Sequence, residues 1–121
     1  GFHNYWLNKS NAWIVHEWSK AGKEMVSICS EVIINQSNIK ILKQAGRELL
    51  LCQSSDWSFI LKAGTTTELA RERINLHLKR FWMLINSIKD NKIINDTNLK
   101  EIEKEDCIFP LISPIDWKKK I

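Results

Sequence analysis

Apolar side chains recur along the chain every three to four residues, the spacing of one face of an α-helix. The first such stripe predicts a helix over about residues 11–33, preceded by Ser10, a residue type that can cap a helix. Its members are Ile14, Trp18, Ala21, Met25, Ile28 and Cys29. After a polar break at 35–37, a second stripe predicts a helix that begins near residue 38. Its members are Ile39, Leu42, Ala45, Leu49 and Leu50.

The second stripe is interrupted by a polar shoulder at 53–56 before apolar residues resume. We therefore expect one or two further helical turns, ending at Gly64, a residue suited to the position after a helix. Thr65 and Glu68 then have the spacing of a capping box. The apolar stripe that follows predicts a third helix over about 66–89.

The last part of the chain is more polar and predicts one short, charged helix. This helix opens at Asn98 and ends near residue 106, before Pro110. Beyond it we expect an extended chain. Residues 1–9 are aromatic and polar without a period, so we expect no helix there.

The composition fits a helical protein. Apolar residues make up 44% and charged residues 26% of the 121 positions, as in an ordinary globular domain. Four glycines and two prolines are too few for a turn-rich β-sandwich or barrel. We therefore expect an all-α fold, a bundle of three long helices plus a short C-terminal helix, forming a single helical domain over residues 1–121.

The formal charge of +4 raises one alternative, a basic helical module that binds nucleic acid. The lysines and arginines are spread around the three long helices with acidic residues between them, and they form no basic stripe. We therefore expect no nucleic-acid partner, although the alternative stays open at this point.

The cysteines and the hydropathy bear on location. Cys29, Cys52 and Cys107 are odd in number and widely spaced, which fits neither a disulfide framework nor a zinc site and favours a reducing, cytoplasmic compartment. No segment reaches the roughly 18 uninterrupted apolar residues of a membrane span, so we expect no membrane partner. The chain begins at Gly1 without a Met, and we interpret it as a piece of a longer polypeptide.

Residues that could carry chemistry are sparse. His3, His16 and His77 lie far apart and no two cysteines are close, so we expect no metal. The glycines are isolated, so no phosphate-binding loop and no cofactor are expected. The glutamates, Glu48 among them, fall on amphipathic helices, mostly on predicted solvent faces. We therefore expect no catalytic residue in this chain and no activity from it alone.

Tryptophan is the unusual residue, with six copies against one tyrosine. Trp18 and Trp82 lie where helix packing is the simpler interpretation, and Trp13, in the first turn of the first helix, suits either packing or binding. Trp6 and Trp57 differ, because each follows small polar residues.

An aromatic platform beside short polar groups suits a sugar ring, which has an apolar face edged by hydroxyl groups. Gln53, Ser54, Asp56 and Trp57 supply both features within five residues. The alternative is that the polar residues cap a restarting helix while Trp57 joins the core. The residues alone leave both interpretations open.

The segment Arg47–Ile60 resembles the helix and shoulder of the C-terminal helical domain in glycoside hydrolase family 57 enzymes of the 1,4-α-glucan branching type. The resemblance extends over nearly the whole chain. It includes Tyr5-Trp6-Leu7-Asn8, Asn11-Ala12-Trp13-Ile14, Gly64-Thr65-Thr66, Ala70, Arg73, His77, Arg80, Phe81 and Ile108-Phe109-Pro110.

The resemblance implies a longer retaining enzyme of glycogen biosynthesis that cuts an α-1,4 link and rejoins the glucan as an α-1,6 branch. Its two catalytic acids belong to a barrel on the same polypeptide and have no counterpart here. The helical domain packs beside that barrel and lines the groove for an α-glucan, glycogen or an amylose-like chain. By resemblance this role falls on Trp6, and also on Trp57 and Asp56.

Three alternatives remain within this resemblance. The parent enzyme could be a 4-α-glucanotransferase or an α-glucan hydrolase instead. The bundle could also be purely structural, with Trp6 and Trp57 buried against the barrel. Independently of these alternatives, we expect the isolated chain to have some tendency to self-associate, through an apolar seam that the barrel would cover.

Overall fold

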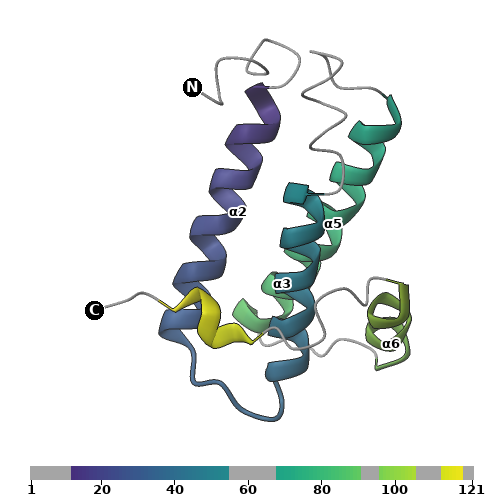
Figure 1. Ribbon diagram of the computed structural model, residues 1–121. Helices are drawn as coiled ribbons and strands as arrows, with labels where there is room; N and C mark the ends of the chain where they lie inside the picture. The colour runs from purple at the N-terminus through teal and green to yellow at the C-terminus, as the bar shows by residue number, and fades with distance from the viewer. Residues whose placement is uncertain (1–11, 55–67, 91–95, 106–112, 119–121) are drawn as a thin grey trace.

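The computed structural model describes residues 12–54, 68–90, 96–105 and 113–118. The described part contains three long helices and two short ones (Figure 1). They are α2 (Ala12–Glu31), α3 (Ile39–Ser54), α5 (Glu68–Lys89), α6 (Asp96–Glu105) and the 3-10 helix η1 (Pro114–Trp117). The expected all-α bundle of three long helices plus a short one is confirmed.

The three long helices form a bundle in which α3 packs most extensively against α5 (Figure 1). Helices α2 and α5 run in the same direction, and α3 runs back between them. Helix α6 contacts α3, and η1 lies across α2 and α3 near the turn that joins them. The start of α2, the end of α3 and the start of α5 therefore all lie toward the same end of the bundle.

The polar break after the first helix is an asparagine-stabilised turn. The Asn35 side-chain oxygen accepts hydrogen bonds from the backbone N–H groups of Ser37 and Asn38, at 2.8 and 3.1 Å. The Asn38 side-chain oxygen in turn accepts a bond from the Asn35 N–H at 2.9 Å. Asparagine satisfies the free N–H groups at a helix start in this way, which is why α3 begins here.

The predicted apolar stripes form the core. Ile14, Met25, Leu42 and Phe81 are fully buried, and α2, α3 and α5 all contribute to one cluster. Cys29 and Cys52 belong to this cluster as free thiols. Trp18 and Trp82, expected to pack, are partly buried against it.

Helix α6 and η1 are small elements held by a few contacts. Leu99 and Ile102 are buried on the inner face of α6, and the Arg80 guanidinium pairs with the carboxylate of Glu105. Helix α6 begins two residues earlier than the expected Asn98.

A single turn of 3-10 helix was not expected in the C-terminal region. The η1 turn forms because the Asp116 side chain accepts a bond from the Ser113 N–H at 3.1 Å, while the Asp116 N–H donates to the Ser113 carbonyl at 3.0 Å. Part of the chain thought to be extended is therefore a turn. The Ser10 cap, the turns expected up to Gly64, the Thr65 capping position and residues 1–9 lie outside the described residues.

Candidate functional site

Three of the six candidate glucan-binding residues lie within the described helices. Trp13 is in the first turn of α2, whereas Gln53 and Ser54 form the last two positions of α3. Because α2 and α3 run in opposite directions, these turns lie toward the same end of the bundle (Figure 1). Trp6, Asp56 and Trp57 lie outside the described residues.

The two candidates whose side chains are described are only partly exposed. Trp13 is partly buried and packs against the core cluster. Gln53 is also partly buried. The Trp13 ring therefore contributes to packing, and any contact with a ligand would use its remaining surface.

A polar cluster that the sequence did not predict lies between α3 and α5, near the middle of both helices. The Glu48 side chain is fully buried, which corrects the expectation that it lies on a solvent face. One carboxylate oxygen of Glu48 is 2.9 Å from Nδ1 of His77, and the other accepts a bond from the Gln44 amide at 2.8 Å. Burial is possible because both oxygens have partners.

The i, i+4 spacing of Gln44 and Glu48 was the available signal, because these residues lie beside the apolar stripe rather than opposite it. The assignment of Glu48 to solvent failed because α3 is covered from more than one side, by α2, α5 and α6. A helix in this position buries more of its circumference than a single stripe indicates.

Arg47 extends the polar cluster along α3. One terminal guanidinium nitrogen of Arg47 donates to the Gln44 side-chain oxygen at 2.9 Å. Its Nε atom is buried, and no described atom accepts a bond from it. The Gln44 amide thus joins Arg47 on one side to Glu48 on the other, and it uses both its oxygen and its nitrogen.

A second polar contact ties all three long helices together. The indole N–H of Trp18 on α2 donates to the Cys52 sulfur on α3 at 3.0 Å. The Cys52 thiol lies 3.9 Å from the carbonyl oxygen of Ile74 on α5. Because its N–H is directed at Cys52, Trp18 has a structural role, as expected.

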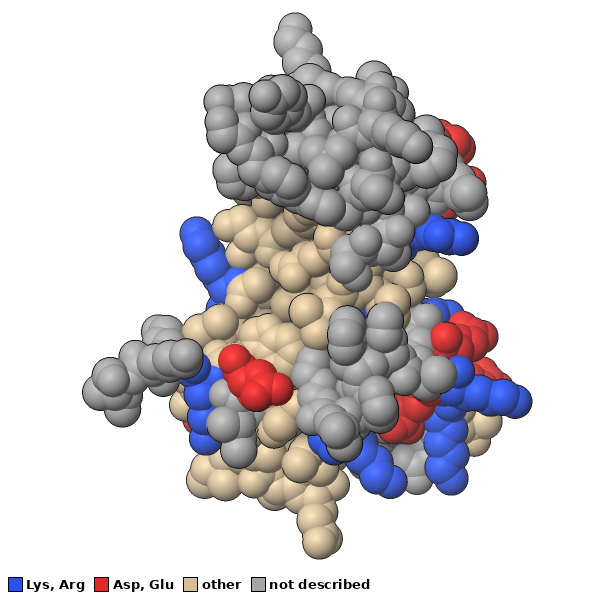
Figure 2. All heavy atoms as spheres, viewed as in Figure 1, with Lys and Arg blue, Asp and Glu red and all other residues tan. Residues whose placement is uncertain are grey.

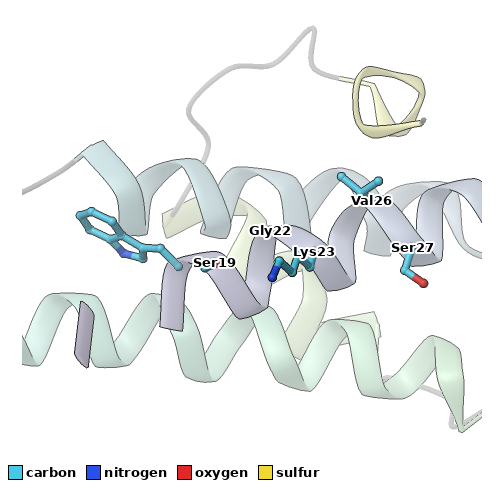
Figure 3. A pocket seen from close by; sticks show the side chains of 6 residues that line it. Ser19, Gly22, Lys23, Val26 and Ser27 are labelled. Atoms are coloured by element: carbon cyan, nitrogen blue, oxygen red, sulfur yellow. The ribbon is translucent and has the colours of Figure 1, made fainter. Parts of the chain in front are cut away.

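An open groove of about 420 Å³ lies along the outer face of α2 (Figure 3). Its lining comes from consecutive turns of this one helix, with Ser19 toward one end and Val26 and Ser27 toward the other. Lys23 supplies its charge, and Trp18 and Gly22 also line it. Neither Trp13 nor Gln53 is among the described residues that line this groove, and those lining residues include no carboxylate.

The surface charges are mixed. Seen from the side shown in Figure 1, the described Lys and Arg side chains lie beside Asp and Glu (Figure 2). Between α2 and α5, Lys89 lies 2.9 Å from Glu24, and this contact raises the pKa of Lys89. Next to it, the Lys20 ammonium lies over the Trp82 ring at 5.6 Å from its centre.

The described residues also bear on whether the chain has a metal site or a membrane-spanning helix. Within the described ranges, no group of three or more His, Cys, Asp or Glu side chains is placed to hold a metal ion. Among the described helices, none combines the length and the apolar character needed to cross a membrane.

Comparison with known proteins gives consistent matches over most of the chain. Residues 17–117 match the family described as 1,4-alpha-glucan branching enzyme, C-terminal. A 1,4-alpha-glucan branching enzyme of Thermococcus kodakarensis is 29% identical over an alignment of 111 positions, and the match covers 88% of this chain and 16% of that enzyme.

A solved structure is also similar over most of the chain. The chain is similar to the alpha-amylase AmyC of Thermotoga maritima with a TM-score of 0.78 and 29% identity. This match covers 94% of the chain but 22% of the amylase. The chain therefore spans less than a quarter of the length of either relative.

Proposed function

The chain belongs to the family of C-terminal domains of 1,4-alpha-glucan branching enzymes, and we propose that it is the single helical accessory domain of a longer, cytoplasmic enzyme of glycogen biosynthesis. The match over residues 17–117 is the observation that carries this proposal. The parent enzyme would cut an α-1,4 link, hold the glucan covalently and rejoin it as an α-1,6 branch.

The chemistry itself would take place on a catalytic barrel of the same polypeptide. A retaining mechanism needs two carboxyl groups about 5 Å apart that both reach the substrate. Glu48 does not meet this requirement, because it is fully buried and both of its oxygens are engaged by Gln44 and His77. The 121-residue chain alone should therefore show no branching activity.

The contribution of this chain would be one wall of the glucan groove. Its members would be Trp6, Trp13, Gln53, Ser54, Asp56 and Trp57, which combine indole rings with short polar groups. The position of Trp13, Gln53 and Ser54 toward the same end of the bundle supports this assignment. Sugar rings stack on aromatic faces while polar side chains bond their hydroxyl groups.

A domain exchange tests the assignment. The matching region of the Thermococcus kodakarensis branching enzyme would be replaced by this chain, and branching of amylose would be compared with that of the same enzyme lacking the region. We expect the exchange to restore branching. A folded hybrid that has no more activity than the truncated enzyme would contradict the proposal.

Single substitutions in the hybrid test the wall. We expect Trp6→Ala and Trp57→Ala to raise KM for amylose about tenfold, since losing a stacking contact worth about 1.4 kcal/mol weakens binding tenfold. Trp82→Phe is the matched control, because Trp82 packs between α2 and α5 near Lys20. An equal effect of all three substitutions would count against a groove wall.

A second candidate is α-glucan hydrolysis or 4-α-glucanotransfer, favoured by the similarity to a protein described as an alpha-amylase. The products separate the three reactions. Branching creates α-1,6 links in amylose, transfer changes only the chain lengths, and hydrolysis releases reducing ends. Linkage analysis of the products of the parent enzyme would decide between them.

A further inference from the structure

The buried cluster of Gln44, Glu48 and His77 lies in the most extensive helix contact of the molecule, between α3 and α5. The neighbouring positions in this contact are apolar, including the fully buried Leu49 and Ile74. An ionisable pair in such surroundings costs desolvation energy, and a hydrophobic pair would pack there at least as well. Its presence therefore needs a reason other than stability.

Two contacts show how α3 and α5 are aligned. Glu48 meets His77, and Cys52, four residues further along α3, meets Ile74, three residues back along α5. From the first contact to the second, the position moves four residues forward along α3 and three residues back along α5. This is expected of two antiparallel helices packed in one register. By the same register, the last turn of α3 at Gln53 lies level with the first turns of α5.

This register sets the two points between which residues 55–67 run. That stretch leaves the last described turn of α3 at Ser54 and joins the first turn of α5 at Glu68. Glu48 lies about 9 Å along α3 from Ser54, at 1.5 Å per residue. A slip of one helical turn would move one attachment point by about 5.4 Å relative to the other.

We propose that Gln44, Glu48 and His77 are positioning residues, whose buried contacts hold α3 and α5 in one register and so place the ends of the segment that carries Asp56 and Trp57. Apolar helix faces can pack in more than one register, whereas a slip here would break the buried contact between Glu48 and His77. The functional part rests on the proposed glucan-binding wall, and the register itself does not.

Substitutions that keep size but weaken the pair test the proposal in the 121-residue chain. Glu48→Gln and His77→Gln would be compared with Ile85→Val, a core truncation in the last two turns of α5, away from the cluster. Binding of maltoheptaose would be followed by tryptophan fluorescence. We expect both cluster variants to raise Kd about tenfold, and Ile85→Val to leave Kd unchanged even where it lowers the melting temperature as much.

Amide hydrogen exchange gives a readout that needs no sugar. We expect the cluster variants to increase exchange at 49–54 and 68–73 together, while residues 18–28 of α2 stay protected. The double variant E48Q with H77Q should change exchange by less than the two single changes combined, because the residues act as one pair.

The outcomes separate the two proposals. If the unaltered chain does not bind maltoheptaose, the groove wall fails, and exchange alone then decides the register. If exchange at the two helix ends rises no more in the cluster variants than in Ile85→Val, the positioning role is overturned. The positioning role is also overturned if the increase in Kd of each variant, Ile85→Val included, simply correlates with its loss of melting temperature.

Discussion

Burial controls the chemistry of Cys29, one of the core residues that α2 contributes. Loss of contact with water disfavours its thiolate and raises the pKa of the thiol from 9.0 to about 11, while the charge of Lys118 opposes the shift. The side chain is fully buried. At neutral pH, Cys29 therefore acts as a small apolar side chain and is unreactive in the folded protein.

The raised pKa of Cys29 makes stability depend on alkaline pH. The unfolded chain loses this proton near pH 9.0 and the folded chain only near pH 11. Between these pH values deprotonation therefore stabilises the unfolded state relative to the folded one. The contribution of Cys29 to the free energy of unfolding is therefore unchanged below about pH 9 and falls progressively up to pH 11. Its size is on the order of 2 kcal/mol.

Urea unfolding of the natural chain and of Cys29→Ala at several values between pH 8 and pH 11 measures this effect. The difference in unfolding free energy between the two proteins should fall as the pH rises, because the variant lacks the group that titrates. Cys52→Ala serves as a second buried thiol for comparison. A difference that stays constant over this range would show that burial does not shift the Cys29 pKa.

At the scale of the elements, η1 packs closely on α3 through Trp117 and Gly46. A Cβ atom at Gly46 would lie 2.7 Å from Cη2 and 2.9 Å from Cζ3 of the Trp117 ring, closer than real Cβ atoms come to other atoms. The missing side chain of Gly46 is therefore what allows the indole to lie against α3. Gly22 in α2 differs, because a Cβ atom there would have no described atom within 4 Å apart from its chain neighbours and the backbone of its own helix.

Gly46→Ala should detach η1 from α3 while the three long helices stay folded. Helix α3 gains about 1 kcal/mol from the higher helix propensity of alanine, but the Trp117 ring has to leave its place. We expect faster hydrogen exchange at 114–118 and an altered near-ultraviolet circular dichroism spectrum, with a small change in melting temperature.

Gly22→Ala is the matched control. It adds the same methyl group to a helix without a clash, so it should stabilise the protein by about 1 kcal/mol and leave η1 unchanged. If Gly46→Ala behaved in the same way as Gly22→Ala, the close packing of Trp117 on α3 would be contradicted.

Helix periodicity made α2, α3 and α5 predictable, since each presents a long apolar stripe to the core. The smaller elements were less predictable for a physical reason. Helix α6 is held by Leu99, Ile102 and the pairing of Arg80 with Glu105, and η1 by Trp117 on Gly46. These are contacts between distant parts of the chain, which no local pattern encodes.

On the scale of the whole molecule, the net charge of +4 is distributed without a basic face in the view of Figure 2. Several cations have nearby partners, such as Lys89 with Glu24 and Arg80 with Glu105. Such an arrangement gives weak, sequence-independent attraction to a polyanion, which salt screens over about 8 Å at physiological ionic strength.

We expect the chain to elute from immobilised DNA below about 0.15 M salt. Three consecutive lysines, Lys118-Lys119-Lys120, come just before the last residue, Ile121, and replacing all three by glutamine would measure how much of any retention this run causes. Retention that persists above physiological salt and does not depend on these lysines would favour the nucleic-acid alternative over a glucan-binding wall.

The candidate site was predictable only in part. The residue types that suit a sugar could be selected from sequence, because indoles beside short polar groups are a local feature, and the structure brings Trp13, Gln53 and Ser54 toward one end of the bundle. Their role in binding stays a prediction. The cluster of Gln44, Glu48 and His77 was missed, because Glu48 and His77 are 29 residues apart in the sequence.

The spacing of apolar residues was enough to predict the helical class, the long helices and most of the core, because this spacing is local and each helix must bury its stripe. Which polar side chains join that core depends on how the helices pack together. Glu48 is buried because α5 brings His77 to it, and Trp117 reaches Gly46 because the chain returns to α3. Burial of a polar or aromatic group depends on what covers it, and the covering residues come from distant parts of the chain.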